Sequence, residues 1–249
     1  MKIIAVIPAR YASTRFPGKP LADICGKPMI WWVYNEAIKN EEFADVIIAT
    51  DSDKIMKVCK ELDMHAMMTS DRHPTSFDRA AEVSFKTDGD HYVIIMGDEP
   101  IIKVEDEKKL VDAIRSGVEA DVIQLVETMN YPADVVSQTT IKLAINDEGY
   151  SIFMSRAPIP IPKGALEYTY YKCIGCYAMK REALEFFAKT KRGNLELAED
   201  ITQLRLIENH KKIFTVKADF QSVSVDTPKE LERVRRVIEQ RLAMGDIIW

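Results

Sequence analysis

The amino-acid sequence predicts an α/β fold with a mostly parallel, doubly wound sheet and a small antiparallel insertion. Short apolar runs alternate with segments of helical periodicity over residues 2–96, and the alternation returns at residue 174. Between these parts, residues 121–172 contain short β-like runs separated by polar and proline-rich stretches. Helices that alternate with strands cover both faces of a sheet, and ligands then bind beyond the carboxyl ends of the strands.

The amino-terminal half supplies parallel strands in order. Residues 2–7 form a nearly continuous apolar run, as expected for a strand covered on both faces. The proline-containing, basic segment 8–20 lacks periodicity and is expected to be a loop. The other expected elements are a helix at 29–38, a strand at 45–49, a helix at 52–62, a strand at 66–68, a helix at 78–85 and a strand at 92–96.

Residues 121–172 are expected to form antiparallel strands, as a β-rich insertion in a single domain that spans residues 1–249. Proline recurs on alternate residues after residue 157, so 157–165 is expected to be an extended loop and a candidate subunit interface. The α/β pattern resumes with a strand at 174–179 and helices at 181–188 and 198–208.

The last helix has a start signal in its sequence. Thr227 is a candidate N-cap, Pro228 stands in the first turn, and Glu230 completes a capping box. The helix is expected to bury one apolar face, made of Leu231, Val234, Ile238 and Leu242. Residues 222–226 are expected to be a strand that ends at Asp226.

Composition and charge exclude several classes of protein. The 34 basic and 39 acidic residues give a net charge of −5, which argues against nucleic acid as a main partner. No apolar stretch approaches the roughly 20 residues that span a bilayer, and the amino-terminal run is too short for a signal peptide. The protein is therefore expected to be soluble and cytoplasmic, with no membrane partner.

Four cysteines are too few for a disulfide framework in a chain of this length. Cys173 and Cys176 form a C-x-x-C pair, whose spacing suits a redox pair or half of a zinc site. Because no second pair exists, the sequence favours two small residues on a buried strand.

The loop after the first strand is a candidate anion site. Arg10, Arg15 and Lys19 bring three positive charges to the sheet edge where doubly wound folds bind ligands. Gly18 permits close approach of the backbone to a ligand. A polyphosphate fits this loop, and the alternative is a solvated basic turn. The loop is not a P-loop, because Lys19 is followed by Pro20 rather than Ser or Thr.

Two aspartates follow later strands. Asp98 comes after the apolar run 92–96 through one glycine, and Asp226 ends the run 222–226. Two carboxylates that converge on a polyphosphate would hold Mg²⁺, which prefers oxygen ligands. Strand-end aspartates are commonly turn or cap residues, but their coincidence with the basic loop favours a metal site.

Five motifs together resemble one family. They are P-A-R-Y-A-S-T-R-F-P-G-K-P-L from Pro8, G-D-E-P from Gly97, S-R-A-P-I-P from Ser155, I-G-x-Y-A from Ile174 and V-D-T-P-x-E-L-E-R-V-R from Val225. Collinear from Ile3 to Arg236, the sequence is similar to the CMP-Kdo synthetases, the 3-deoxy-manno-octulosonate (Kdo) cytidylyltransferases. The resemblance implies the Rossmann-like fold of nucleotide-diphospho-sugar transferases.

The resemblance also implies an activity and its residues. The enzyme would transfer CMP from CTP to a small acidic sugar, Kdo or a related ulosonic acid, and release pyrophosphate, with Mg²⁺ as cofactor and as a homodimer. The implied catalytic residues are Lys19, Arg10, Asp98 and Asp226, the last two as metal ligands. The implied nucleotide-binding residues are Pro8, Ala9, Arg10, Arg15, Lys19, Thr75, Ser76 and Asp98. The implied acceptor-binding residues are Met96, Arg156, Cys173, Tyr177, Glu199 and Gln203.

Four positions depart from the family's pattern. Met96 stands where the family has a glutamine, Cys173 where it has a histidine, and Ser70 where it has an arginine. Phe77 replaces a hydroxyl-bearing residue in the stretch that faces cytosine in the family. These changes predict a less polar acceptor pocket, and hence an acceptor that is related to Kdo but differs from it.

Two other functions stay open. One is a CTP-dependent nucleotidyltransferase that acts on a phosphorylated acceptor and makes a CDP-linked product. The other is a nucleotide-binding homologue without turnover. Lys19, Asp98 and Asp226 argue against the second, because a protein that only binds nucleotide does not need a pair of metal carboxylates.

Overall fold

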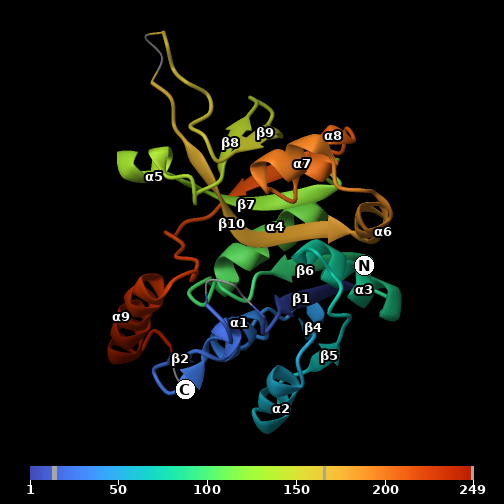
Figure 1. Cartoon of the computed structure of the whole chain (residues 1–249), viewed down its shortest axis with the longest axis vertical. Helices are drawn as coiled ribbons and strands as arrows, with labels where there is room; N and C mark the ends of the chain where they lie inside the picture. The colour runs from blue at the N-terminus through green and yellow to red at the C-terminus, as the bar shows by residue number, and fades with distance from the viewer. Residues whose placement is uncertain (13–15, 165–166, 248–249) are drawn as a thin grey trace.

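The computed structural model describes residues 1–12, 16–164 and 167–247. Its central sheet has the strand order β11-β7-β10-β6-β1-β4-β5 and runs through the middle of the molecule (Figure 1). These strands are β1 (Ile3–Ala9), β4 (Phe43–Thr50), β5 (Ala66–Met68), β6 (His91–Ile95), β7 (Val122–Thr128), β10 (Tyr171–Lys180) and β11 (Ile213–Lys217).

The strand directions confirm the expected fold class. β5, β4, β1 and β6 pair in parallel, whereas β10 runs antiparallel to both β6 and β7. β11 pairs in parallel with β7. The sheet is therefore mostly parallel, with an antiparallel part that contains β7 from the β-rich segment 121–172.

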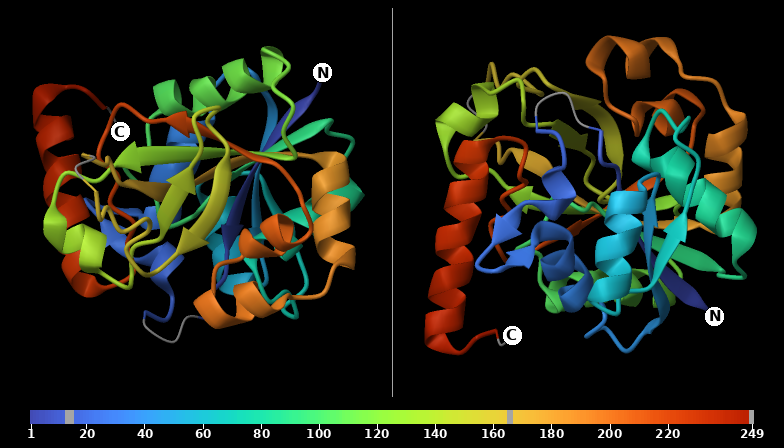
Figure 2. Two further views of the ribbon diagram at one scale, coloured as in Figure 1. Left: turned by 90° about the horizontal axis from the view of Figure 1, so that it is seen from above. Right: turned by 60° about the horizontal axis from the view of Figure 1, so that its bottom comes forward.

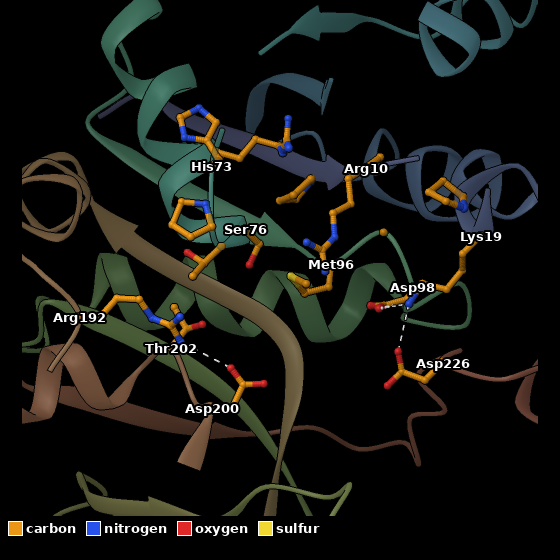
Figure 3. A pocket seen from close by; sticks show the side chains of 17 residues that line it. Arg10, Lys19, His73, Ser76, Met96, Asp98, Arg192, Asp200, Thr202 and Asp226 are labelled. Carbon is orange, nitrogen blue, oxygen red and sulfur yellow. Dashed lines mark hydrogen bonds and ion pairs between the residues drawn. The ribbon is translucent and has the colours of Figure 1, made fainter. Parts of the chain in front are cut away.

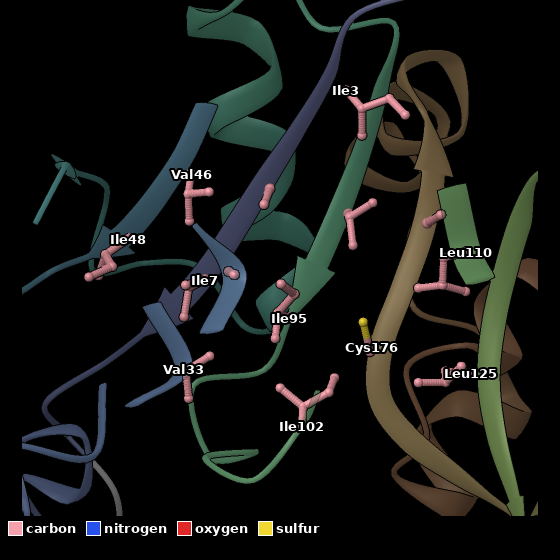
Figure 4. Close-up of a cluster of buried hydrophobic side chains, with 14 of the residues drawn as sticks. Ile3, Ile7, Val33, Val46, Ile48, Ile95, Ile102, Leu110, Leu125 and Cys176 are labelled. Carbon is pink, nitrogen blue, oxygen red and sulfur yellow. The ribbon is translucent and has the colours of Figure 1, made fainter. Parts of the chain in front are cut away.

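Helices cover both faces of the sheet, as Figure 2 shows from two further directions. α1 (Met29–Ala37), α2 (Asp53–Glu61) and α4 (Val104–Arg115) pack on one face, and Figure 4 shows the core beneath them. α3 (Ser76–Lys86), α6 (Arg181–Lys189) and α8 (Leu204–Glu208) pack on the other. Successive side chains of β1 point to opposite faces, so its continuous apolar run serves both cores.

Two smaller parts flank this frame. β8 (Lys142–Ile145) and β9 (Ser151–Ser155) form a hairpin that joins β10 through β8. The hairpin and α5 (Pro132–Val136) lie at one end of the molecule (Figure 1). At the other end, α9 (Pro228–Met244) packs against the small ribbon of β2 (Asp23–Ile24) and β3 (Lys27–Pro28).

The carboxyl-terminal third corrects two expectations. The helix expected at 198–208 is wrong, because α7 (Asn194–Glu199) ends at Asp200, whose backbone is left-handed with a φ of 50°. The strand expected at 222–226 is also wrong, since this segment joins no sheet. It is extended, and the Val225 N–H donates to the carbonyl of Asp98 at 2.9 Å. The capping box of Thr227 and Glu230 is confirmed.

α4 and β11 were not among the expected elements. α4 is dominated by charged residues, and its buried stripe is short, with Leu110, Val111 and Ile114 facing the sheet. No helix in the described ranges combines the length and the apolar character needed to cross a bilayer.

Candidate active site

A pocket of about 380 Å³ opens beyond the carboxyl ends of β1 and β6 (Figure 3). This is the edge at which the doubly wound pattern predicts a ligand. Its walls come from the ends of both strands, the start of α3, the segment after α6 and the segment before α9. The lining residues are Pro8, Ala9, Arg10, Lys19, Pro20, His73, Pro74, Thr75, Ser76, Arg79, Met96, Gly97, Asp98, Arg192, Asp200, Thr202 and Asp226.

Lys19 joins the two predicted metal carboxylates at one end of this pocket. Its Nζ lies 2.6 Å from Asp98 Oδ2 and 3.2 Å from Asp226 Oδ1. Burial disfavours the Lys19 ammonium, but Asp98 and Asp226 outweigh this and raise the pKa of Lys19 above its usual value. The ammonium therefore stays charged at neutral pH, and the three side chains carry a net negative charge.

Each of these three side chains is placed by its local backbone. Gly18, at a φ of 71°, turns the chain into the short 3₁₀ helix η1 (Lys19–Leu21) and so aims Lys19 inward. Asp98 lies in the turn after β6, where the Glu99 N–H donates to the carbonyl of Met96. Asp226 is fixed from behind, because its N–H donates to Glu230 Oε2 at 2.7 Å.

Glu99 lies buried directly behind this group. Burial, followed by the charge of Asp98, raises the pKa of Glu99 to about 8. One of its oxygens accepts the Gly175 N–H at 3.1 Å. Near neutral pH this carboxyl is therefore largely protonated, and it adds little negative charge to the site.

The chemistry of Asp98 and Asp226 fits a divalent cation. Both carboxylates approach one ammonium, so their oxygens lie close to each other. Within the described ranges, no group of three or more His, Cys, Asp or Glu side chains could hold a metal by itself. Mg²⁺ commonly takes one or two carboxylates and completes its shell with substrate phosphates and water. The pair therefore suits Mg²⁺ that arrives with a polyphosphate.

The predicted nucleotide-binding residues form the adjoining wall. Thr75 caps α3 by accepting the Asp78 N–H, which leaves Ser76 in the first turn of the helix. The positive end of the α3 dipole thus faces the pocket. Arg10 forms no ion pair with any described residue, so its guanidinium is available to a ligand. Arg15 lies outside the described residues.

The predicted acceptor-binding residues divide into one that lines the pocket and five that do not. Met96 lines the pocket, whereas the other five do not. Arg156 donates to the carbonyls of Glu199 and Asp200, and the Glu199 carboxylate accepts from the Arg156 N–H and from Ser155. These two side chains are therefore engaged with protein groups in this structure.

Gln203, Tyr177 and Cys173 also lie behind the pocket wall. Gln203 Nε2 donates to Gln124 Oε1 at 3.4 Å, and both side chains are buried. Tyr177, on β10, packs edge-on against Phe77. Cys173 and Cys176 are free thiols on the same strand, and burial raises the pKa of Cys173 to about 12.

Phe77 has a different place from the one that the sequence suggested. Its ring is buried between Tyr177 and Phe187 in the core under α3 and α6, and it does not line the pocket. The side chain points inward because α3 turns its apolar face, not its capped start, toward the sheet. Of the departures from the family's pattern, Met96 alone lines the pocket.

Several lining residues escaped the sequence analysis. Arg192, Asp200 and Thr202 follow α6 and lie on either side of α7, where no strand end signals a site. Arg79 lines the pocket from α3, but its guanidinium is bound by Asp51, Thr69 and the Ser70 carbonyl. His73 contacts Glu82. Polar residues at these helix ends look like ordinary caps in a single sequence.

Comparison with known proteins places this geometry among CTP-using enzymes. The sequence profile of the family described as Cytidylyltransferase matches residues 4–213. The 3-deoxy-manno-octulosonate cytidylyltransferase of Escherichia coli is 36% identical over 97% of this chain and 98% of its own length. That of Geotalea uraniireducens (strain Rf4) is 38% identical over 94% of this chain and 98% of its own.

A solved structure is similar over the same range. The structure of CMP:2-keto-3-deoxy-manno-octonic acid synthetase complexed with CTP superimposes with a TM-score of 0.92, at 36% identity, and covers 97% of this chain and 100% of that one. A 4-diphosphocytidyl-2C-methyl-D-erythritol synthase from Anaerococcus prevotii, at 14% identity and a TM-score of 0.63, shares the fold.

Proposed function

We propose, from the premise that this chain belongs to the 3-deoxy-manno-octulosonate cytidylyltransferase family, that it transfers CMP from CTP to Kdo or a closely related ulosonic acid. The products are a CMP-sugar and pyrophosphate. The observation that carries the proposal is the ion pairing of Lys19 with Asp98 and Asp226 at one end of the pocket. The amino-terminal end of α3 forms an adjoining wall of the same pocket.

The reaction suits these residue types. A sugar hydroxyl attacks the α-phosphorus while pyrophosphate leaves, so catalysis consists of positioning and of neutralising charge on phosphate oxygens. Lys19 is held by two carboxylates in a fixed place, which means that little reorganisation is needed when the charge develops. Arg10 and the start of α3 hold the rest of the triphosphate.

Asp98 and Asp226 are the proposed holders of Mg²⁺. When bound there, the ion would neutralise the α-phosphate and the leaving pyrophosphate as a Lewis acid. Asp226 is anchored by Glu230, and Asp98 by the turn after β6, so the two carboxylates are held in place before substrate arrives. The protonated Glu99 behind them avoids a third negative charge.

Kdo is the first acceptor to test. The hypothesis of a different acceptor rested on three less polar side chains, and Phe77 lies in the core while Cys173 lies behind the wall. Met96 is the remaining change at the pocket surface. One altered side chain supports a shift in preference among ulosonic acids rather than a change of substrate class.

The proposal includes a homodimer. Large apolar side chains are exposed on α5, on β9 and on the extended segment after it: Tyr131, Val136, Ile152 and Ile161. These elements lie at the same end of the molecule (Figure 1). Burial of such a surface against a second copy would remove apolar area from water.

The proposal is tested by pyrophosphate release with each of the four nucleoside triphosphates and Mg²⁺ against a panel of acceptors. The panel contains Kdo, other ulosonic and sialic-type acids, sugar phosphates and other phosphorylated small molecules. We expect release with CTP and a free ulosonic acid. Release only with a phosphorylated acceptor would replace the proposed substrate class, and CTP binding without release across the panel would indicate a binding protein.

A further inference from the structure

The end of the pocket remote from Lys19 carries its own polar wall. Arg192, Asp200 and Thr202 line this end and are called the α7 wall here, because they flank α7 on both sides. Figure 3 shows Arg192, Asp200 and Thr202 together on one side of the pocket, and Lys19, Asp98 and Asp226 on the other. Nothing in the proposed phosphate chemistry uses the α7 wall.

Arg192 is built into the wall by a buried partner. Its Nε donates to Glu196 Oε1 at 3.0 Å, and Glu196 is itself fully buried. Glu196 is held in turn by two 2.7 Å hydrogen bonds from Arg205. Arg192 Nη2 reaches Asp200 Oδ1 at only 3.5 Å, and Nη1 has no partner among the described residues. The guanidinium is thus oriented while it keeps donors for a ligand.

The backbone of Asp200 is also fixed by its surroundings. Its left-handed backbone is uncommon for a non-glycine residue, and surrounding contacts must fix such a conformation. Arg156 provides them by donating to the carbonyls of Glu199 at 2.7 Å and of Asp200 at 3.0 Å. Arg156 therefore supports the wall from behind and leaves the Asp200 carboxylate exposed toward solvent and pocket.

The chemistry of the acceptor decides which part of it meets this wall. In a 2-ulosonic acid, the attacking anomeric hydroxyl and the carboxylate are attached to the same carbon, C2, so the carboxylate end must lie near the α-phosphorus, at the Lys19 end. The remaining carbons carry hydroxyl groups and extend away from that point. A hydroxyl both donates and accepts hydrogen bonds, and the α7 wall offers a guanidinium, a carboxylate and a hydroxyl.

We infer that the α7 wall binds the hydroxyl-bearing tail of the acceptor and that Arg192 and Asp200 select acceptors with a long tail. The inference rests on the proposed function. The α7 wall is separate from the start of α3, which the proposed triphosphate site uses, because its residues come from the segments on either side of α7.

The test compares Arg192→Ala with Lys191→Ala, a neighbouring exposed cation that does not line the pocket. Each is assayed with Kdo and with a 3-deoxy-2-ulosonic acid that lacks the terminal carbons. Hydrogen bonds to a charged group contribute roughly tenfold or more to affinity. We expect the KM for Kdo to rise by about tenfold or more in Arg192→Ala, the KM for CTP to stay unchanged, and the shortened acid to show no such penalty.

The other outcomes separate the possible errors. An equal rise in the KM for CTP would show that the wall reads the nucleotide and would overturn the inference. A lower melting temperature with both KM values unchanged would show that Arg192 only supports Glu196, again overturning it, and partial recovery of the Kdo KM in Arg192→Lys would support it. Absence of wild-type turnover with any ulosonic acid would overturn the proposed function itself, whereas wild-type turnover with an unaffected Arg192→Ala would overturn this inference alone.

Discussion

Lys19 is the residue on which the proposed catalysis most depends, because one ammonium contacts both carboxylates and belongs to the proposed phosphate site. Lys19→Ala removes a preorganised positive charge, which in comparable sites costs about 10²–10³-fold in kcat. We expect a loss of this size or larger, with the fold retained. Pyrophosphate release and thermal unfolding measure the two effects, and Lys57→Ala, on the exposed surface, is the control. Wild-type rates in Lys19→Ala would show that the phosphate site lies elsewhere.

Glu82 makes a pH-dependent contribution to stability at the edge of the pocket. Burial disfavours its carboxylate, but hydrogen bonds from Lys86, His73 and the Ser70 N–H outweigh this and lower the pKa of Glu82 to about 2. A carboxyl whose pKa is lower in the folded state stabilises the fold above its unfolded pKa of about 4.5, and this contribution is lost as the pH falls toward 2.

The comparison of wild type with Glu82→Gln measures this contribution. We expect the variant to unfold more easily by about 1–3 kcal/mol at pH 7, and the difference to shrink below about pH 4.5. Glu61→Gln, in an exposed pair with Lys57, is the matched control and should change stability little. A difference for Glu82→Gln that is constant from pH 7 to pH 3 would contradict the assignment.

The position of a side chain can be predicted from the sequence where that side chain follows a strand. Arg10 and Asp98 come within three residues of the ends of apolar runs, and the fold carries both to one edge. Arg192 and Asp200 could not be found this way, because they reach the pocket through helix ends whose path depends on tertiary contacts with Glu196 and Arg156. Phe77 shows the same limit, since its direction depends on where α3 starts.

At the scale of elements, the turn after β6 is held by its contact with β10. The Met96 N–H donates to the Gly175 carbonyl at 2.7 Å, and a Cβ at Gly175 would lie 2.8 Å from Met96 Cβ. Gly175→Ala must therefore displace the turn that carries Asp98. We expect turnover to fall by tenfold or more and stability to fall by about 1–3 kcal/mol. Gly164→Ala, with open space around it, is the control, and unchanged kinetics in Gly175→Ala would refute the close packing.

Some helix boundaries can be predicted from local sequence signals alone, and others cannot. The capping box of Thr227 and Glu230 is encoded within four residues, so its prediction from sequence is confirmed. The break between α7 and α8 is not local, because Arg156 fixes it from a distant part of the chain. Residues 222–226 alternate like a strand but are held by single contacts, among them Ser222 to Glu127 and Val225 to Asp98.

For the whole molecule, the alternation of strands and helices was enough to predict the fold class, since it requires helices on both faces of a sheet. The position of β10 was not predictable in this way. Its apolar pattern suits a parallel strand, yet it runs antiparallel between β6 and β7. The reversal brings Tyr177 and Gly175 behind the pocket.

The proposed dimer makes a prediction at this scale. Ile161 is 80% exposed at the end of the molecule that carries α5, β8 and β9. Light scattering should give wild type about twice the chain mass of 28.4 kDa and Ile161→Glu a mass nearer to one chain. Met244→Glu, at a residue that is 74% exposed on α9, should leave the dimer intact. A monomeric wild type at micromolar concentration would rule out the dimer. A monomeric Met244→Glu variant would show that the interface involves α9 and not the end that carries Ile161.

Phosphorus NMR of the reaction gives a direct test of the claim that this pocket transfers CMP from CTP to an ulosonic acid. With CTP, Mg²⁺ and Kdo, the wild-type protein should produce a phosphodiester signal and free pyrophosphate in equal amounts, and Asp98→Asn should produce neither at a comparable rate. A pyrophosphate-linked product from a phosphorylated acceptor, or no phosphodiester with any ulosonic acid, would contradict the claim.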